Sequence, residues 1–99
     1  MMYVVIWEYA VRPGSESAFE ALYGPHGAWV ALFREYSGYL DTELLRSHEA
    51  GAYLTIDRWL SEAHYDAFQR AAAPRYAEID ALGDTLTLDE CRIGRYTVP

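Results

Sequence analysis

The order in which strand-like and helix-like segments alternate constrains the fold of this chain more than any other feature. Residues 3–11 are rich in β-branched and aromatic side chains, which is typical of a strand. Apolar residues then recur at helical spacing over 15–23 and 25–36, with a Gly- and Pro-containing interruption at 24–27. The first third of the chain therefore predicts one strand followed by two stacked helical pieces.

Two further strands precede the second helical stretch. Residues 39–47 and 52–59 are separated by a short turn, which predicts an antiparallel hairpin. Ser61 is a suitable N-cap for a helical stretch that ends at Gly83. Residues 91–98 predict the last strand. The resulting order, β-α-β-β-α-β, predicts a single α+β, ferredoxin-like domain with a four-stranded antiparallel sheet and helices on one face.

This topology leaves the other face of the sheet without helices. Its apolar side chains need a cover, which a second copy of the chain would supply through two-fold symmetry. The nine Tyr, three Trp and three Phe residues support this view, because they are more ring surface than a 99-residue interior needs. We therefore expect a homodimer formed through the sheet face, and a ligand pocket between sheet and helices in each subunit.

Composition argues against several classes of partner. The net charge is −7, from 15 acidic and 8 basic residues, and every basic residue is Arg. A chain without a basic stripe is not expected to bind nucleic acid or anionic membranes. Cys91 is the only cysteine, so we expect no internal disulfide and a buried, apolar role for this side chain. Neither a signal-type N-terminus nor a long apolar run is present, so we expect a cytoplasmic location.

Four segments are similar to those of a known family. They read YGPHGAW at 23–29, LFR at 32–34, GYLDTELLR at 38–46 and YLTIDRW at 53–59. On these segments the chain resembles the antibiotic biosynthesis monooxygenase domains of the dimeric α/β-barrel superfamily. The resemblance covers nearly the whole chain and implies the dimeric barrel fold. It does not fix a reaction, because the superfamily also contains haem-degrading enzymes, isomerases, decarboxylases and members without known activity.

The monooxygenases of this family work on polyphenols without flavin, haem or metal. A deprotonated phenol is electron-rich enough to react with dioxygen directly, so the protein supplies a dry aromatic slot, hydrogen bonds to the oxyanion and a proton acceptor. The resemblance therefore implies no cofactor. A metal site is not expected either, because the three His residues lack metal-ligand spacing.

The resemblance also implies catalytic residues. Trp59 and Tyr65 match a Trp and a Tyr that donate hydrogen bonds near the substrate oxygens, although both can equally be core rings. His64, beside Tyr65, is a candidate general base, or else a solvated residue in the first helical turn. Two departures weaken this match: Thr55 stands where such enzymes have Asn, and Ile79 stands near the position of an Arg.

Arg75 is the basic residue nearest to that missing Arg. Asp57 lies on the Trp59 face of its strand, so its carboxylate needs a partner if it is buried. We expect Arg12, Arg34 or Arg46 to pair with it, and a role as general base is the alternative. Aromatic residues, Tyr9 included, provide a pool of rings for the pocket wall. The expected substrate-binding side chains are Trp7, Tyr23, His26, Trp29, Phe33, Tyr53, Thr55, Asp57 and Phe68.

Three functions remain open from the sequence. The first is a cofactor-independent monooxygenase, or a related isomerase, acting on a small aromatic or polyketide-like molecule. The second is a non-catalytic, ligand-binding or stress-related homodimer, and the third is a structural module whose rings only fill a core and an interface. Haem degradation is disfavoured, because the helix after Trp59 offers no haem-binding His and the first strand has no Asn.

Overall fold

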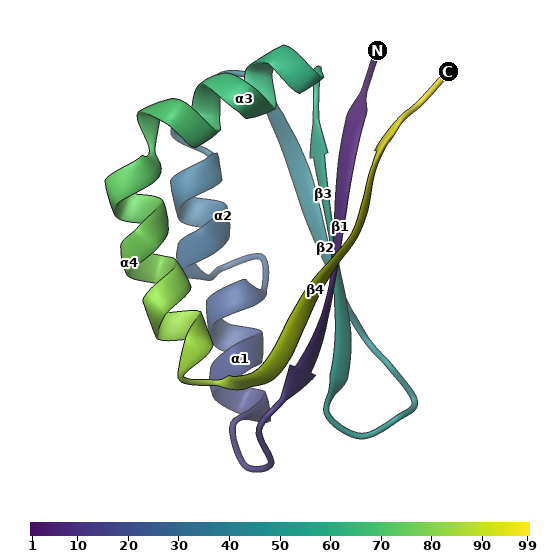
Figure 1. Ribbon diagram of the computed structural model, residues 1–99, viewed down its shortest axis with the longest axis vertical. Helices are drawn as coiled ribbons and strands as arrows, with labels where there is room; N and C mark the ends of the chain where they lie inside the picture. Colours follow the sequence, from purple (N-terminus) through teal and green to yellow (C-terminus); the bar gives the residue numbers. More distant parts are fainter.

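The computed structural model describes all 99 residues and confirms the predicted order of elements. The strands form one antiparallel sheet in the order β2-β3-β1-β4, and all helices lie on one side of it (Figure 1). This is the α+β, ferredoxin-like arrangement. The elements are β1 (Tyr3–Val11), α1 (Glu16–Tyr23), α2 (Ala28–Phe33), β2 (Tyr39–Arg46), β3 (Ala52–Trp59), α3 (Glu62–Ala71), α4 (Ala73–Asp84) and β4 (Thr87–Thr97).

Each helical stretch consists of two pieces, as the interruption at 24–27 and Pro74 predict. Between α1 and α2, a side chain on Gly27 would collide with the carbonyl oxygen of Leu22, so the close approach of the two pieces requires glycine. Helix α2 is shorter than expected. After Phe33 the backbone bonds change to an i→i+3 pattern, with Glu35 donating to Leu32 and Tyr36 to Phe33, and the α-helix ends there.

Strand β3 lies inside the sheet and alternates strictly between its two faces. Tyr53, Thr55, Asp57 and Trp59 are buried toward the helices, whereas the residues between them are partly exposed on the opposite face. Because β1 pairs with β3 from Tyr3–Trp59 onward, both strands direct rings into the same interior. This shared inner face is the floor on which a site can be built.

The last strand departs from the sequence-based expectation. It begins at Thr87 rather than Cys91, because a bulge in the pairing with β1 lets Val11 face Thr87 directly. The expectation that Cys91 is buried is wrong for the single chain. Cys91 pairs with Glu8 on the face away from the helices and is exposed.

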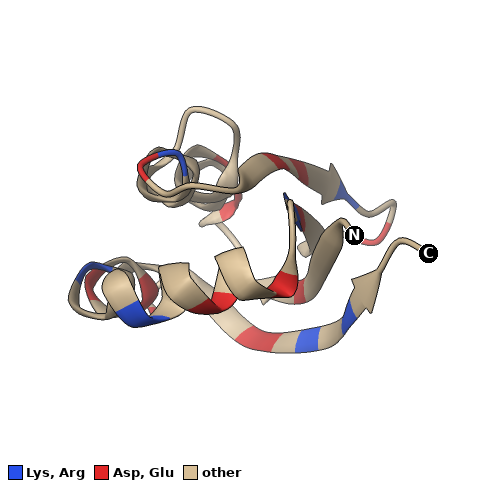
Figure 2. Cartoon of the chain, turned by 90° about the horizontal axis from the view of Figure 1, so that it is seen from above, with Lys and Arg blue, Asp and Glu red and all other residues tan.

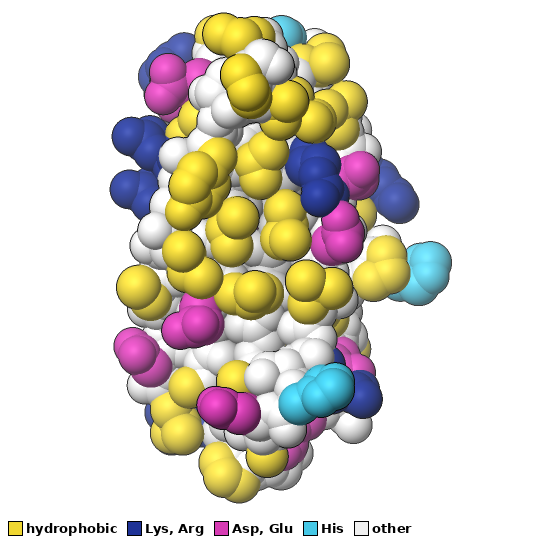
Figure 3. Space-filling model, turned by 90° about the vertical axis from the view of Figure 1, so that its right-hand side faces the viewer, with side chains coloured by type: hydrophobic (Ala, Val, Ile, Leu, Met, Phe, Trp, Pro, Cys, Tyr) yellow, Lys and Arg dark blue, Asp and Glu magenta, His cyan; other side chains and the backbone are white.

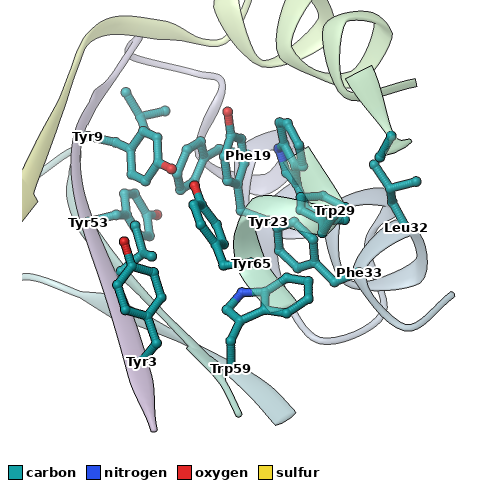
Figure 4. Packing of buried hydrophobic residues seen from close by; sticks show 14 residues of the cluster. Tyr3, Tyr9, Phe19, Tyr23, Trp29, Leu32, Phe33, Tyr53, Trp59 and Tyr65 are labelled. Atoms are coloured by element: carbon teal, nitrogen blue, oxygen red, sulfur yellow. The ribbon is translucent and has the colours of Figure 1, made fainter. Parts of the chain in front are cut away.

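A continuous cluster of rings fills the space between sheet and helices (Figure 4). Trp59 is fully buried, and its ring centroid lies 5.0 Å from that of Phe68 and 5.8 Å from that of Phe33. Phe68 is 1% exposed and also contacts the rings of Tyr36 and Phe33 edge-on. These rings hold the α2, α3 and β3 elements against one another.

The opposite face of the sheet is apolar and open. Figure 3 looks onto this face and shows apolar side chains gathered in its middle, with charged side chains at the borders. Leu45, Ile93 and Tyr96 of the two edge strands are 42%, 47% and 49% exposed, respectively. Arg and acidic residues are scattered over helices and strands without a basic stripe (Figure 2). None of the helices has the length and apolar composition that crossing a bilayer requires.

Candidate functional site

A cavity lies between the inner face of the sheet and helices α2 and α4. The cavity has a volume of about 40 Å³, and the whole space between the lining atoms, including its mouth, is about 430 Å³. Six aromatic rings form its wall, those of Trp7, Tyr9, Tyr23, Trp29, Phe33 and Tyr76. Its polar groups are Thr42, Thr55, Asp57, Asp80 and Glu90. The cavity is therefore a narrow aromatic slot with carboxyl groups in its wall.

Asp57 is the most deeply buried carboxyl group of the cavity. It accepts a 2.7 Å hydrogen bond from the hydroxyl of Thr42, which in turn lies 2.8 Å from the hydroxyl of Tyr39. Because Thr42 uses its proton on Asp57, Tyr39 is the donor to Thr42. Burial raises the pKa of Asp57 to about 6, although the Thr42 hydrogen bond opposes this shift.

The expectation that an Arg pairs with Asp57 is wrong. Arg46 lies at the surface, where its guanidinium binds Glu20 at 2.7 Å. Neither Arg12 nor Arg34 has an ion pair with Asp57, whose only hydrogen bond comes from Thr42. A buried carboxyl without a cation keeps its proton to a higher pH, which explains the direction of the pKa shift.

A second group of carboxyls lies where α4 meets β4. The carboxylate oxygens of Asp80, Asp84 and Glu90 all lie within 4.8 Å of one another, and Asp80 and Glu90 line the cavity. Burial and repulsion from their acidic neighbours raise the pKa values of Asp80 and Glu90. None of the ion pairs in the structure involves these three residues.

Two indole nitrogens in the interior have no hydrogen-bond partner. Nε1 of Trp29 and Nε1 of Trp59 are both buried without an acceptor. Trp29 lines the cavity, and its nitrogen is on the side nearer Tyr23 (Figure 4). Burial raises the pKa of the Tyr23 hydroxyl to about 12, and the nearby Trp29 N–H opposes this shift. The two groups nevertheless do not meet the geometry of a hydrogen bond. A buried N–H of this kind is costly unless a ligand or water supplies the acceptor.

Trp59 and Tyr65 lie together, at the end of the cavity nearest α3. Their ring centroids are 5.7 Å apart, and neither residue lines the open space. The Tyr65 hydroxyl accepts a 2.7 Å hydrogen bond from Nε2 of Gln69, so its own proton remains free to donate. The Asp57 carboxylate is close enough to raise the pKa of Tyr65 together with burial, which is the larger cause.

The histidines lie away from the cavity. Nδ1 of His64 is 2.7 Å from the hydroxyl of Ser61, which also caps α3 by accepting a hydrogen bond from the His64 backbone N–H. His26 is exposed and borders a separate, shallow hollow between α1 and α4. The structure therefore does not bring either imidazole to the aromatic slot.

Two of the expected substrate-binding rings also have other surroundings. Tyr53 packs on Phe19 and donates a 2.6 Å hydrogen bond to Glu20, outside the cavity. Phe68 belongs to the core behind the cavity wall. The remaining six expected residues all line the cavity, namely Trp7, Tyr23, Trp29, Phe33, Thr55 and Asp57.

Sequence reasoning did not select four of the lining residues. Thr42 lies opposite Asp57 on β2, which strand pairing alone would indicate once the hairpin register is known. Tyr76 and Asp80 are four residues apart on α4, and helical spacing places them on one face. Glu90 lies in a segment that was expected to be a connection rather than a strand, so no alternation could be applied to it.

No Arg side chain takes the place of the Arg that the family has near the position of Ile79. Arg75 is exposed and forms a double hydrogen bond with Glu35 at 2.6 and 2.7 Å, so it points away from the cavity. On β4, Arg92 shares the inner face with Glu90 but is exposed and outside the lining. Its charge lowers the pKa of Tyr65 slightly, which places it toward the Tyr65 end.

The family of the chain follows from a comparison with family models. Residues 2–77 match the model of the antibiotic biosynthesis monooxygenase family. The chain belongs to this family. No curated protein sequence matches it.

Several solved structures share the fold of this chain. SnoaB from Streptomyces nogalater, described as a cofactor-independent oxygenase, is 23% identical with a TM-score of 0.78, over 99% of this chain and 93% of that one. ActVA-Orf6 of Streptomyces coelicolor, a monooxygenase in complex with nanaomycin D, is 22% identical with a TM-score of 0.79, over 98% and 87%. Rv0793 from Mycobacterium tuberculosis is 20% identical with a TM-score of 0.73, over 100% and 96%.

Proposed function

We propose that this member of the family oxygenates a small polycyclic phenol in the aromatic slot without a cofactor. The observation that carries the proposal is Asp57, a buried carboxyl with a pKa of about 6 in a wall of rings. A general base is most effective when its pKa lies near the working pH. Asp57 meets this condition, whereas His64 is held by Ser61 outside the slot. In this proposal Asp57 replaces His64 as the base.

The proposed roles of the donors follow from their unused protons. The N–H of Trp29 and the hydroxyl proton of Tyr65 have no acceptor within the protein. Oxygens of the substrate would accept these protons, and the bond to an oxygen that becomes negative on deprotonation strengthens as the charge develops. Trp59, which also has an unpaired N–H, is proposed as a further donor once a ligand separates the Tyr65 ring from it. The ligand must displace side chains, because the open space is small.

The proposed reaction balances without a further redox partner. Asp57 takes the acidic proton of the substrate, and the resulting anion passes one electron to dioxygen. The two radicals combine into a C–O bond, and protonation of the outer oxygen by Asp57 gives a hydroperoxide. For an anthrone-type substrate, loss of water then converts the ring CH₂ into C=O. One oxygen atom remains in the quinone and the other leaves as water.

Oxygen uptake tests the proposal directly. With an anthrone-type substrate, and with EDTA present to exclude metals, the protein is expected to consume one O₂ per quinone formed. Tyr65→Phe is expected to lower kcat/KM by about 100-fold, the cost of losing one donor to an oxyanion. Tyr36→Phe is the matched control, because Tyr36 packs on Phe68 and forms no hydrogen bond through its hydroxyl. Unchanged turnover in Tyr65→Phe would remove the role given to Tyr65.

A second candidate function is ligand binding without catalysis. It is favoured by Thr55, which stands where the family's monooxygenases have Asn, and by Ile79, which stands near the position of their Arg. Tight binding of phenols with no oxygen uptake across a panel would establish it in place of the oxygenase.

We further propose that the chain functions as a homodimer through the open sheet face. Light scattering at micromolar concentration is expected to give twice the 11.3 kDa mass of the chain. Ile56→Asp, which places a charge in the middle of that face, is expected to give a folded monomer. Leu82→Asp is the control, because Leu82 is 57% exposed on the helical side. A wild-type mass near 11 kDa would refute the dimer.

A further inference from the structure

The charges around the slot are unusual for a site that handles an anion. Asp57, Asp80 and Glu90 line it, and no Arg or His does. All ion pairs of the structure are formed by other acidic residues, so these three carboxyl groups are not paired with a cation of the protein. Arg92 is the nearest base on the inner face of β4, and it lies outside the lining toward Tyr65.

The wall of the same cavity also contains a buried donor, the indole N–H of Trp29. Trp29 lines the cavity and is 7% exposed, and its ring nitrogen is buried without a hydrogen-bond partner, on the side nearer Tyr23 (Figure 4). An isolated donor of this kind calls for an oxygen or another acceptor on the molecule that fills the slot. The slot therefore contains one unpaired donor, the Trp29 N–H, and two carboxyl groups without a cation, those of Asp80 and Glu90 at its α4–β4 end.

We infer that the slot selects aromatic molecules that carry a protonated amine, with the ammonium group bound by Asp80 and Glu90 and the rings packed against Trp29 and Tyr76. This inference rests on the proposed function, because it assigns a substrate class to the same site. The rings of Trp29 and Tyr76 meet edge to face with centroids 4.8 Å apart and adjoin the two carboxyls in the lining. Aromatic faces attract cations as well as ring systems, so the walls and the carboxyls favour the same kind of ligand.

The inferred charge also resolves a difficulty in the chemistry. A phenolate formed next to Asp80 and Glu90 would be repelled by them, since like charges interact strongly inside a protein. An ammonium group on the same molecule would neutralise these carboxyls, and the phenolate oxygen would lie at the other end of the slot, with the Tyr65 hydroxyl as its donor. An aromatic acid, by contrast, would add a further negative charge to an acidic site.

Binding of three matched probes tests the inference. The probes are 1-(aminomethyl)naphthalene, 1-naphthalenemethanol and 1-naphthoate, which share one ring system and are cationic, neutral and anionic at pH 7.5. Binding is measured by titration calorimetry at low salt, with EDTA to keep divalent ions from Asp80, Asp84 and Glu90. The amine is expected to bind at least about 10-fold more tightly than the alcohol. The naphthoate is expected to bind most weakly.

Variants connect this preference to the two carboxyls. In the double variant Asp80→Asn and Glu90→Gln, the amine is expected to lose its advantage while the alcohol binds as before. Glu78→Gln is the control, because Glu78 is exposed on α4 and its substitution removes a negative charge outside the slot. Equal or tighter binding of the alcohol or naphthoate, no binding of the amine, or an advantage that survives in the double variant would overturn the inference.

The probes cannot be oxygenated in the proposed way, so the two proposals fail separately. A preference for the amine without oxygen uptake on any substrate would remove only the proposed reaction. Oxygen uptake on anthrone-type substrates without a preference for the amine would remove only the inferred substrate class.

Discussion

Asp57→Asn is expected to abolish oxygen uptake and, at pH 8, to make the protein more stable. The amide cannot take the substrate proton, so kcat/KM is expected to fall by at least about 100-fold. In the wild type, kcat/KM is expected to rise with pH through a midpoint near 6, because Asp57 acts only when ionised. The variant should show no such rise. Oxygen-electrode assays between pH 5 and 8 measure both effects.

The gain in stability follows from the direction of the pKa shift. Burial raises the pKa of Asp57 from 3.8 to about 6, so the folded protein binds this proton more tightly than the unfolded chain does. The free energy of unfolding therefore decreases by about 3 kcal/mol as the pH rises from about 4 to 6. Asn has no charge to bury, so Asp57→Asn is expected to gain up to that amount at pH 8 and little at pH 3.5.

Urea unfolding at the two pH values measures this difference. Asp89→Asn serves as the control, because Asp89 is exposed on β4 and its removal should change stability by less than about 0.5 kcal/mol. A variant that is less stable than the wild type at pH 8, or that keeps full activity, would show that Asp57 is a structural residue and not the base.

Phe68→Ala is expected to destabilise the protein by about 3–5 kcal/mol, a large part of the stability of a domain this size. Phe68 is 1% exposed and packs against Trp59, Phe33 and Tyr36, so its removal leaves a hole between the helices and β3. Chemical unfolding in urea measures the loss. A cost below 1 kcal/mol would mean that neighbouring side chains fill the hole, or that Phe68 is a substrate-binding residue of the pocket wall, as the sequence had predicted.

Leu82→Ala is the matched control for this experiment. Leu82 is 57% exposed at the end of α4, and its truncation is expected to cost less than about 0.5 kcal/mol. The Phe68→Leu variant separates volume from ring contacts, since it keeps an apolar side chain of intermediate size.

The inner wall of the site could be predicted from sequence because it depends on local periodicity. Alternation from Tyr53 to Trp59 assigned the buried face of β3, and Thr55 and Asp57 followed from it. The helix break at residues 24–27 placed Trp29 at the start of α2, and the structure shows this residue in the cavity wall. Such positions need only the period of the strand or helix that carries them.

The other parts of the site depend on pairing between distant segments. Asp80 and Glu90 meet only because β4 begins at Thr87 and its bulged pairing with β1 turns Glu90 inward. The partner of Asp57 was sought among Arg residues, yet the hairpin register presents Thr42 instead. A single sequence carries no signal for these registers, since a shift by one residue reverses every side chain.

The strand order has a consequence for how the chain folds as it is synthesised. Strand β1 is central and pairs with β3 on one side and with β4 on the other. Residues before Thr87 leave the ribosome first, so a β1–β3–β2 sheet that forms in that interval has one long edge of β1 unpaired. Open edges of this kind invite pairing with other chains. The interval before Thr87–Thr97 emerges is therefore when nascent copies are most exposed to aggregation, and slower translation there would prolong it.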